Sequence, residues 1–144
     1  MLRTGDMEAR AGINIERNVT SRTSDASYLR TVKTALEEGI AAFKPDIIFY
    51  NAGTACIVID FAVQVEHWWM AVAGTDILEG DPLGGGVGIS AEGVIQRDQI
   101  VFEAALTHSI PVVMVLSGGY SRASATVVSS SVVNLLTNVI KAVV

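Results

Sequence analysis

The chain has 144 residues, a length that suits one domain with a sizeable buried core. Half of its residues are hydrophobic and 17% are charged, a globular composition that excludes an intrinsically disordered chain. Fifteen acidic residues against ten Lys and Arg give a net charge of −5, which argues against direct binding to nucleic acid or to an anionic membrane.

Cellular location is constrained by a few negative features. Cys56 is the single cysteine, so the sequence offers neither an internal disulfide nor a cysteine cluster for zinc. The N-terminus lacks the apolar core of a signal peptide. The longest uncharged stretch, residues 123–140, contains several Ser, Thr and Asn and is a poor membrane span. We therefore expect an intracellular protein, in the nucleus or the cytoplasm, with no membrane contact.

The first half of the chain predicts one helix and one strand. Residues 1–23 are polar and indicate irregular structure. From Ser24 onwards, apolar residues recur every three or four positions, which predicts a helix capped by Ser24 or Asp25 and stopped by Pro45. The residues expected on its buried face are Leu29, Val32, Leu36, Ile40 and Phe43. Residues 46–53 form an apolar run closed by Asn and Gly, which predicts a short buried strand.

The second half predicts a helix, a strand and a further helix. Ser90 is placed to cap a helix over residues 91–109. The residues expected on its inner face are Ile95, Phe102 and either Ala105 or Leu106. Residues 110–116 predict a second buried strand, and residues 121–142 a third helix. Helices alternating with fully apolar strands are typical of a parallel α/β sheet with covered faces, but two strands make only part of one.

Ligands of open α/β sheets bind beyond the carboxyl ends of the strands, so the loops there are candidate sites. The "SGGY" turn at 117–120 places backbone N–H groups around a small concavity that suits an anion, or simply makes the turn. Residues 119–123 also resemble a nucleophile elbow, but no histidine follows Ser121, which argues against a serine hydrolase. His67 and His108 have no spacing signature and indicate structural roles.

An acidic loop at residues 74–86 carries three carboxylates within six residues, on Asp76, Glu79 and Asp81. These carboxylates can serve a metal or simply belong to a turn, because Asp is common turn chemistry. The glycine run at 84–88 lacks the Lys-Ser/Thr ending of a phosphate loop and does not follow a predicted strand. It is weak evidence for nucleotide binding.

Four motifs occur in a defined order: "FKPDIIFYNAGT", "AGTDILEGDPLGG", "IS-x-x-G-x-x-x-RD-x-x-VF" and "IPVVMVLSGGY". Together they resemble the histone deacetylase family, most of all its class IV branch. The resemblance covers nearly the whole chain except the segment between the two Ala-Gly-Thr tripeptides. It implies a zinc-dependent hydrolase that removes acyl groups from lysine in protein substrates. It also implies that residues 1–144 form a partial domain, the C-terminal portion of a three-layer parallel-sheet (arginase/deacetylase-like) fold.

The resemblance implies roles for individual residues. Asp76 of the "GTD" loop maps to one of the family's three protein zinc ligands. Tyr120 of "GGY" maps to the tyrosine that polarises the substrate carbonyl and stabilises the oxyanion beside the metal. Leu83 would line the acyl-lysine tunnel, and Gly118 and Gly119 would let the substrate approach.

The chain also departs from the family pattern. The family takes its other two zinc ligands from an Asp-x-His motif and its general base from a paired histidine, and neither motif occurs in the 144 residues. Because a catalytic zinc normally has three protein ligands, we expect the chain to be inactive by itself. The alternatives are a non-catalytic interaction module that pairs with a protein partner, or an unstable splicing or gene-model product.

The tripeptide Ala-Gly-Thr occurs at both 52–54 and 73–75. The family has it once, followed directly by aspartate, so we expect residues 55–75 to be an insertion in the zinc-ligand loop. This stretch is apolar enough to demand burial, as an extra strand or helix. Either Asp76 or Ala55 then occupies the ligand position, and the sequence leaves both open.

Overall fold

The computed structural model describes residues 13–52, 58–65, 68–72, 77–83 and 86–141. The strands are β1 (Ile13–Asn18), β2 (Ile47–Asn51), β3 (Val58–Val65), β4 (Trp68–Val72) and β5 (Val112–Val115). The helices are α2 (Asp25–Phe43), α3 (Ala91–Thr107) and α4 (Ser124–Asn134), the last continuing as the π-helix η1 (Leu135–Ile140).

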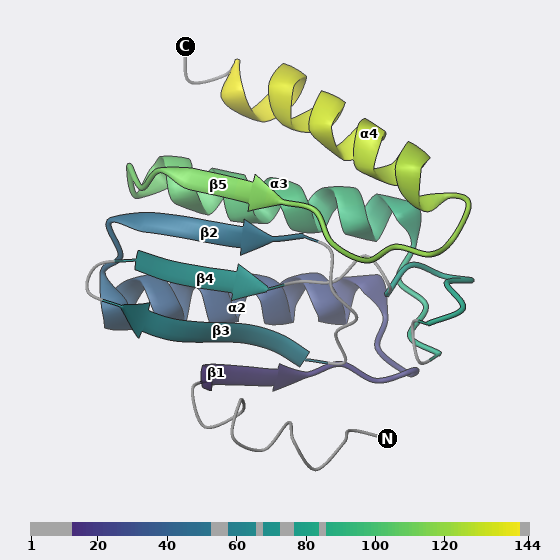
Figure 1. Ribbon diagram of the computed structural model, residues 1–144, viewed down its shortest axis with the longest axis horizontal. Coiled ribbons are helices and arrows are strands. Elements are labelled where there is room, and N and C mark those ends of the chain that lie inside the picture. Colours follow the sequence, from purple (N-terminus) through teal and green to yellow (C-terminus); the bar gives the residue numbers. More distant parts are fainter. Residues whose placement is uncertain (1–12, 53–57, 66–67, 73–76, 84–85, 142–144) are drawn as a thin grey trace.

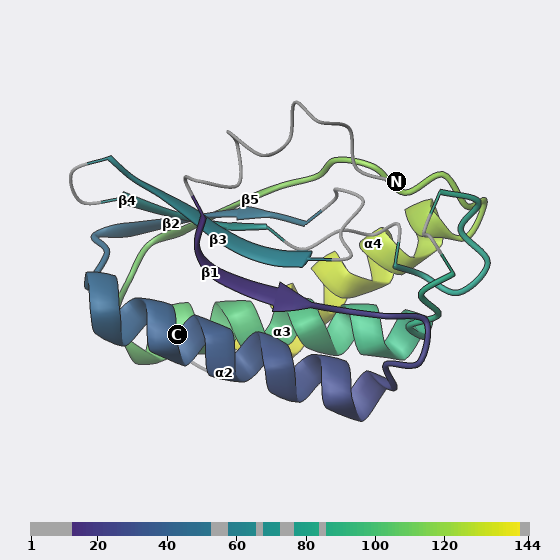
Figure 2. The same ribbon diagram turned by 90° about the horizontal axis from the view of Figure 1, so that it is seen from below.

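The strands form one sheet in the order β1-β3-β4-β2-β5. α2 and α3 lie on one face of this sheet (Figure 2), and α4 packs against α3 beyond the β5 edge (Figure 1). This arrangement confirms the predicted α/β class. On β5, Val113 and Val115 point to the other face and are 41% and 46% exposed. Within the described residues the sheet is therefore covered by helices on one face only, where the alternation of elements had predicted two.

Both long helices begin at the predicted caps. The Ser24 hydroxyl accepts a hydrogen bond from the backbone N–H of Ser27, and α2 ends at Lys44, which adopts a left-handed conformation before Pro45. The Ser90 hydroxyl accepts from the Gly93 N–H at 3.0 Å and starts α3. These two caps fix where the helices enter the core.

The buried face of α2 agrees with the apolar spacing, whereas that of α3 is turned by about one position. The buried residues of α2 are Tyr28, Val32, Ala35, Leu36, Gly39 and Ile40. Those of α3 are Gly93, Val94, Arg97, Asp98, Val101 and Ala105. Of the residues predicted for its inner face, Ala105 is buried, whereas Ile95 and Phe102 pack at the flank of the core and are only partly buried. The buried face contains two charged residues, so a search for apolar positions misplaces it.

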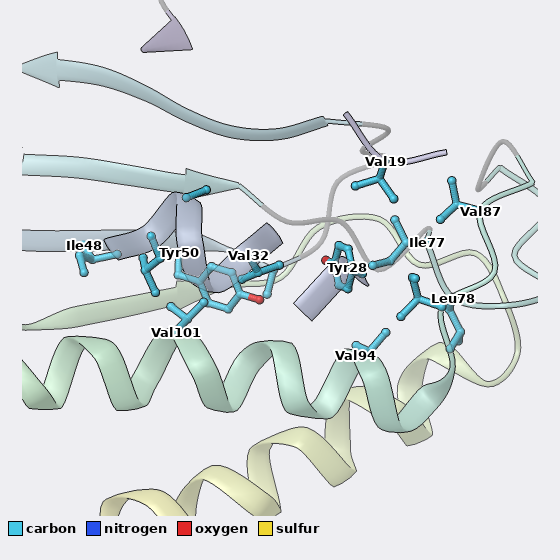
Figure 3. Close-up of a cluster of buried hydrophobic side chains, with 14 of the residues drawn as sticks. Val19, Tyr28, Val32, Ile48, Tyr50, Ile77, Leu78, Val87, Val94 and Val101 are labelled. Carbon is cyan, nitrogen blue, oxygen red and sulfur yellow. The ribbon is translucent and has the colours of Figure 1, made fainter. Parts of the chain in front are cut away.

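The core lies between the sheet and the helices (Figure 3). Toward one end, Ile48 and Tyr50 of β2 meet Val101 of α3. Toward the other end, Ile77 and Leu78, which follow β4 in the chain, pack near Val94. No helix among the described residues combines the length and the apolar content that a membrane span requires.

The sheet is mixed: the two predicted strands, β2 and β5, pair in parallel as expected, and antiparallel strands extend the sheet beyond them. β2 pairs in parallel with β4 and with β5, but β3 runs antiparallel to both β1 and β4. Only residues 66–67 separate β3 from β4. A parallel crossover needs a dozen or more residues, so a link of this length can join only antiparallel neighbours.

The N-terminal segment was expected to be irregular, and for residues 13–18 that prediction is wrong. These residues form β1, which pairs with β3 and places Ile15 opposite Phe61. Ile15 is buried. The strand is short and sits at the edge of the sheet, so its apolar alternation is confined to Ile13 and Ile15.

The two copies of Ala-Gly-Thr follow neighbouring parallel strands. Asn51 ends β2, Val72 ends β4, and these two residues are register partners. The copies begin at the next residues, Ala52 and Ala73. Residues 55–75 contain β3 and β4, so this apolar stretch takes strand form in the middle of the sheet.

Candidate functional site

Two loops meet at the edge where the parallel strands end. β4, β2 and β5 all point toward this edge, and residues 77–83 and 86–89 lie there together with the loop that follows β5 (Figure 1). The carboxyl edge of a parallel sheet is where ligands of α/β proteins bind. It contains both loops singled out from the sequence.

The loop after β5 depends on two glycines. Gly118 and Gly119 have φ angles of 75° and 85°, in the left-handed region that side chains disfavour. Just before them, the Ser117 hydroxyl donates a hydrogen bond of 2.7 Å to the side-chain oxygen of Asn51. The turn that delivers Tyr120 is therefore fastened to the end of β2.

The acidic loop is closed on itself and anchored in the core. Leu78 and Ile89 form a parallel bridge, and Ile89 exchanges backbone hydrogen bonds of 2.9 Å with Ile77 and Glu79. Ile77, Leu78 and Ile89 are buried. The Asp81 N–H then donates to the Leu78 carbonyl at 3.0 Å, and Gly80, with φ of 80°, makes this a type II turn.

The side chain of Asp81 joins the two loops. Its Oδ1 accepts the Leu83 N–H at 2.9 Å within its own loop. Its Oδ2 accepts the N–H groups of Tyr120 at 2.7 Å and Ser121 at 2.9 Å, about 40 residues away in sequence. Of the two interpretations left open, metal or turn, the hydrogen bonds of this carboxylate support the turn. Glu79 beside it is exposed.

The sequence-predicted site residues divide into two sets. Leu83, Gly118, Gly119 and Tyr120 lie at the same edge and are connected through Asp81. The side chains of Leu83 and Tyr120 stand in solvent, since these residues are 59% and 60% exposed. The predicted zinc ligand Asp76, its competitor Ala55 and His67 lie outside the described residues.

The described residues do not by themselves fit a zinc site. Among them, no group of three His, Cys, Asp or Glu side chains is close enough to hold a metal. Both oxygens of Asp81 accept backbone hydrogen bonds. His108 follows the C-terminus of α3, whereas the N-terminus of α3 lies at the loop edge.

A buried polar network supports the strand next to the site. Asp98 of α3 accepts hydrogen bonds from the Tyr50 hydroxyl, from Arg97 Nε at 2.8 Å and from the Ser131 hydroxyl. Arg97 is fully buried and its Nη2 lies 2.7 Å from Asp98 Oδ1. The network joins β2, α3 and α4. Its member in β2 is Tyr50, which directly precedes Asn51, the last residue of that strand at the site edge.

Burial and the charges in this network shift the pKa values of Tyr50 and Arg97. Burial raises the pKa of Tyr50 well above its ordinary value, and the Asp98 carboxylate adds to this rise. For Arg97, burial acts to lower the pKa, but Asp98 and Tyr50 outweigh burial and the pKa lies well above its ordinary value. Tyr50 is therefore a neutral donor and Arg97 a permanent cation.

Sequence reasoning missed the roles of Asp81, Asn51 and Asp98. The composition of the acidic loop predicts Asp81 only as one of three carboxylates, although an Asp two residues before a turn amide is a recognisable Asx-turn signal. The Arg97-Asp98 pair stands out in the sequence only as part of a motif. No local pattern reports that a carboxylate will accept backbone groups 40 residues away.

Comparison with known proteins identifies the family. The Histone deacetylase domain model matches residues 3–136. The chain belongs to the histone deacetylase family. It is 38% identical over 130 residues to Histone deacetylase 2 of Arabidopsis thaliana, a match that covers 90% of this chain and 28% of that protein. An uncharacterized protein of Picosynechococcus sp. is 28% identical over 98 residues, covering 68% of this chain and 25% of that protein.

This histone deacetylase family chain thus spans about a quarter of the length of the curated relatives it matches. The family resemblance expected from the four motifs is confirmed. The α/β architecture, with its parallel strands β4, β2 and β5, is consistent with part of an arginase/deacetylase-like fold.

Proposed function

We propose that the chain carries the C-terminal portion of a zinc-dependent protein-lysine deacylase, of the class IV type, and supplies one wall of its acyl-lysine site. The observation that carries this proposal is the joining of the "GDPL" loop to the "GGY" turn by Asp81 at the carboxyl edge of the sheet. In the family these two stretches contribute the tunnel wall and the catalytic tyrosine.

Each described residue of this wall has a task in the proposed reaction. The Tyr120 hydroxyl donates a hydrogen bond to the acyl carbonyl of the substrate lysine and stabilises the negative charge that develops there. Leu83 contacts the apolar part of the acyl-lysine chain. Gly118 and Gly119 have no side chains to block its approach. Zinc bound by the family's ligand set would activate the attacking water and polarise the same carbonyl.

We also propose that these 144 residues do not complete the reaction alone. Asp76 is one ligand of the family's three, and no Asp-x-His or paired histidine is present. The sheet order adds a second reason, because β2 lies between β4 and β5. In the family the aspartate directly follows the strand that corresponds to β2, which is the neighbour of β5. In this chain Asp76 follows β4 in the sequence, and β4 lies one strand spacing, about 4.8 Å, farther from β5 than β2 does.

Zinc analysis of the purified chain tests this proposal. After dialysis we expect well under one zinc per chain, because a single carboxylate is a weak site where catalytic zinc has three protein ligands. Asp76→Ala is expected to retain as much zinc as the wild-type chain. Glu79→Gln is the control for an exposed carboxylate of the same loop. One tightly held zinc per chain, lost in Asp76→Ala but kept in Glu79→Gln, would contradict the proposal.

A second candidate is a non-catalytic module that binds a protein partner. Apolar side chains exposed on β5 and on α4 favour it; they are Val113, Val115, Val132 and Val133. An evolved module of this kind would sediment as one species, whereas an incomplete domain with the same surface would aggregate.

A further inference from the structure

Asp81 makes more hydrogen bonds to other residues than its place in a surface turn requires. An Asx turn needs only the contact from Oδ1 to the Leu83 N–H. The second oxygen accepts two further N–H groups, of Tyr120 and Ser121, at 2.7 and 2.9 Å. One carboxylate therefore holds the backbone of both loops at the site edge.

These hydrogen bonds are of the strong kind. Hydrogen bonds to an ionised carboxylate are shorter and roughly twice as strong as those between neutral groups. Asp81 is only partly exposed, which limits competition from water. The carboxylate is itself fixed, because the Asp81 N–H closes the type II turn onto the buried Leu78.

Leu83 and Tyr120, whose backbone N–H groups Asp81 accepts, are the two residues whose side chains are predicted to contact the substrate. Leu83 and Tyr120 direct exposed side chains into solvent, so core packing does little to fix where these side chains lie. Gly118 and Gly119 precede Tyr120 and adopt left-handed φ angles that bring it toward Asp81. The Asp81 carboxylate then joins the Leu83 backbone directly to the Tyr120 backbone.

We propose that Asp81 is a positioning residue that sets Leu83 and Tyr120 at a fixed separation, so that one acyl-lysine chain contacts both. This role rests on the proposed function, because positioning Leu83 and Tyr120 matters only if they bind acyl-lysine. The hydrogen bonds of Asp81 themselves involve neither zinc nor substrate. Asp81 itself touches neither the substrate nor the metal. It acts through the backbone of the two residues that do.

Amide hydrogen exchange measured by NMR on the whole chain tests this inference. In Asp81→Ala, the amides of Leu83, Tyr120 and Ser121 are expected to exchange at least about tenfold faster, with their proton resonances shifted upfield. Glu79→Gln, a change to the neighbouring exposed carboxylate, leaves all three amides unchanged. Amides of the α2 and α3 cores serve as the reference for global stability.

A second variant separates positioning from general stability. Asp81→Asn keeps the shape but only one acceptor oxygen, so either Leu83 or the Tyr120 and Ser121 pair should lose protection while the other keeps it. Core amides stay as in the wild type. If Asp81→Ala does not fold, this variant decides the outcome. Tyr120 and Leu83 amides that both stay protected in Asp81→Asn would overturn the inference, whatever zinc analysis shows of the proposed function.

Discussion

Replacing Asp98 with alanine is expected to lower the free energy of unfolding by about 3–5 kcal/mol, the usual cost of breaking a buried ion pair. Asp98 and Arg97 are both buried, and the carboxylate also accepts hydrogen bonds from Tyr50 and Ser131. Alanine removes the charge that neutralises a buried guanidinium and the acceptor of two buried hydroxyls. Since domains of this size have about 5–15 kcal/mol of stability, the loss is a large fraction of the total.

Urea denaturation followed by circular dichroism measures this loss. Asp98→Asn, which keeps the shape without the charge, is expected to lose less than Asp98→Ala. Glu103→Ala, an exposed change on the same helix, should stay within about 0.5 kcal/mol of the wild type. A loss below about 1 kcal/mol for Asp98→Ala would mean that the network does not support β2 as described.

Replacing Ala71 with proline is expected to cost at least about 2 kcal/mol, because it interrupts the ladder in the interior of the sheet. Ala71 lies in β4, opposite Tyr50 of β2 and Phe61 of β3. With a paired strand on each side, its N–H group has a ladder partner, and proline carries no N–H. The residue belongs to the 55–75 segment, so the variant tests whether that segment is built into the sheet.

The same denaturation experiment supplies the measurement, with Ala71→Ser as the control that keeps the backbone N–H. The proline variant should unfold at clearly lower urea than the serine variant, because only proline removes the backbone N–H. Proline tolerated as well as serine would place this segment outside the cooperative fold and would contradict the strand order.

Local signals predicted the elements that depend on local chemistry. The caps at Ser24 and Ser90, the stop before Pro45 and the two strands within 46–53 and 110–116 follow from side-chain hydrogen bonding and apolar runs. The second of these strands is not buried as predicted, because Val113 and Val115 of β5 are exposed. The glycine turn before Tyr120 was likewise visible, because only glycine accepts its backbone angles readily.

Features that depend on contacts distant in sequence were not predicted. The inner face of α3 was misplaced because Arg97 and Asp98 satisfy each other in the core, which a search for apolar spacing does not register. The strand β1 was missed because its register partners in β3 lie 40 or more residues away in the sequence. Asp81 was seen as an acidic loop residue, since its acceptor role depends on Tyr120 folding back onto it.

The most direct measurement is hydrolysis of an acetyl-lysine peptide by the purified chain with zinc added. The chain offers one zinc ligand and no paired histidine to act as base, so we expect no turnover above that of Asp76→Ala or Tyr120→Phe. Robust turnover that Asp76→Ala abolishes would contradict this account, because it would show that these 144 residues complete a catalytic zinc site by themselves.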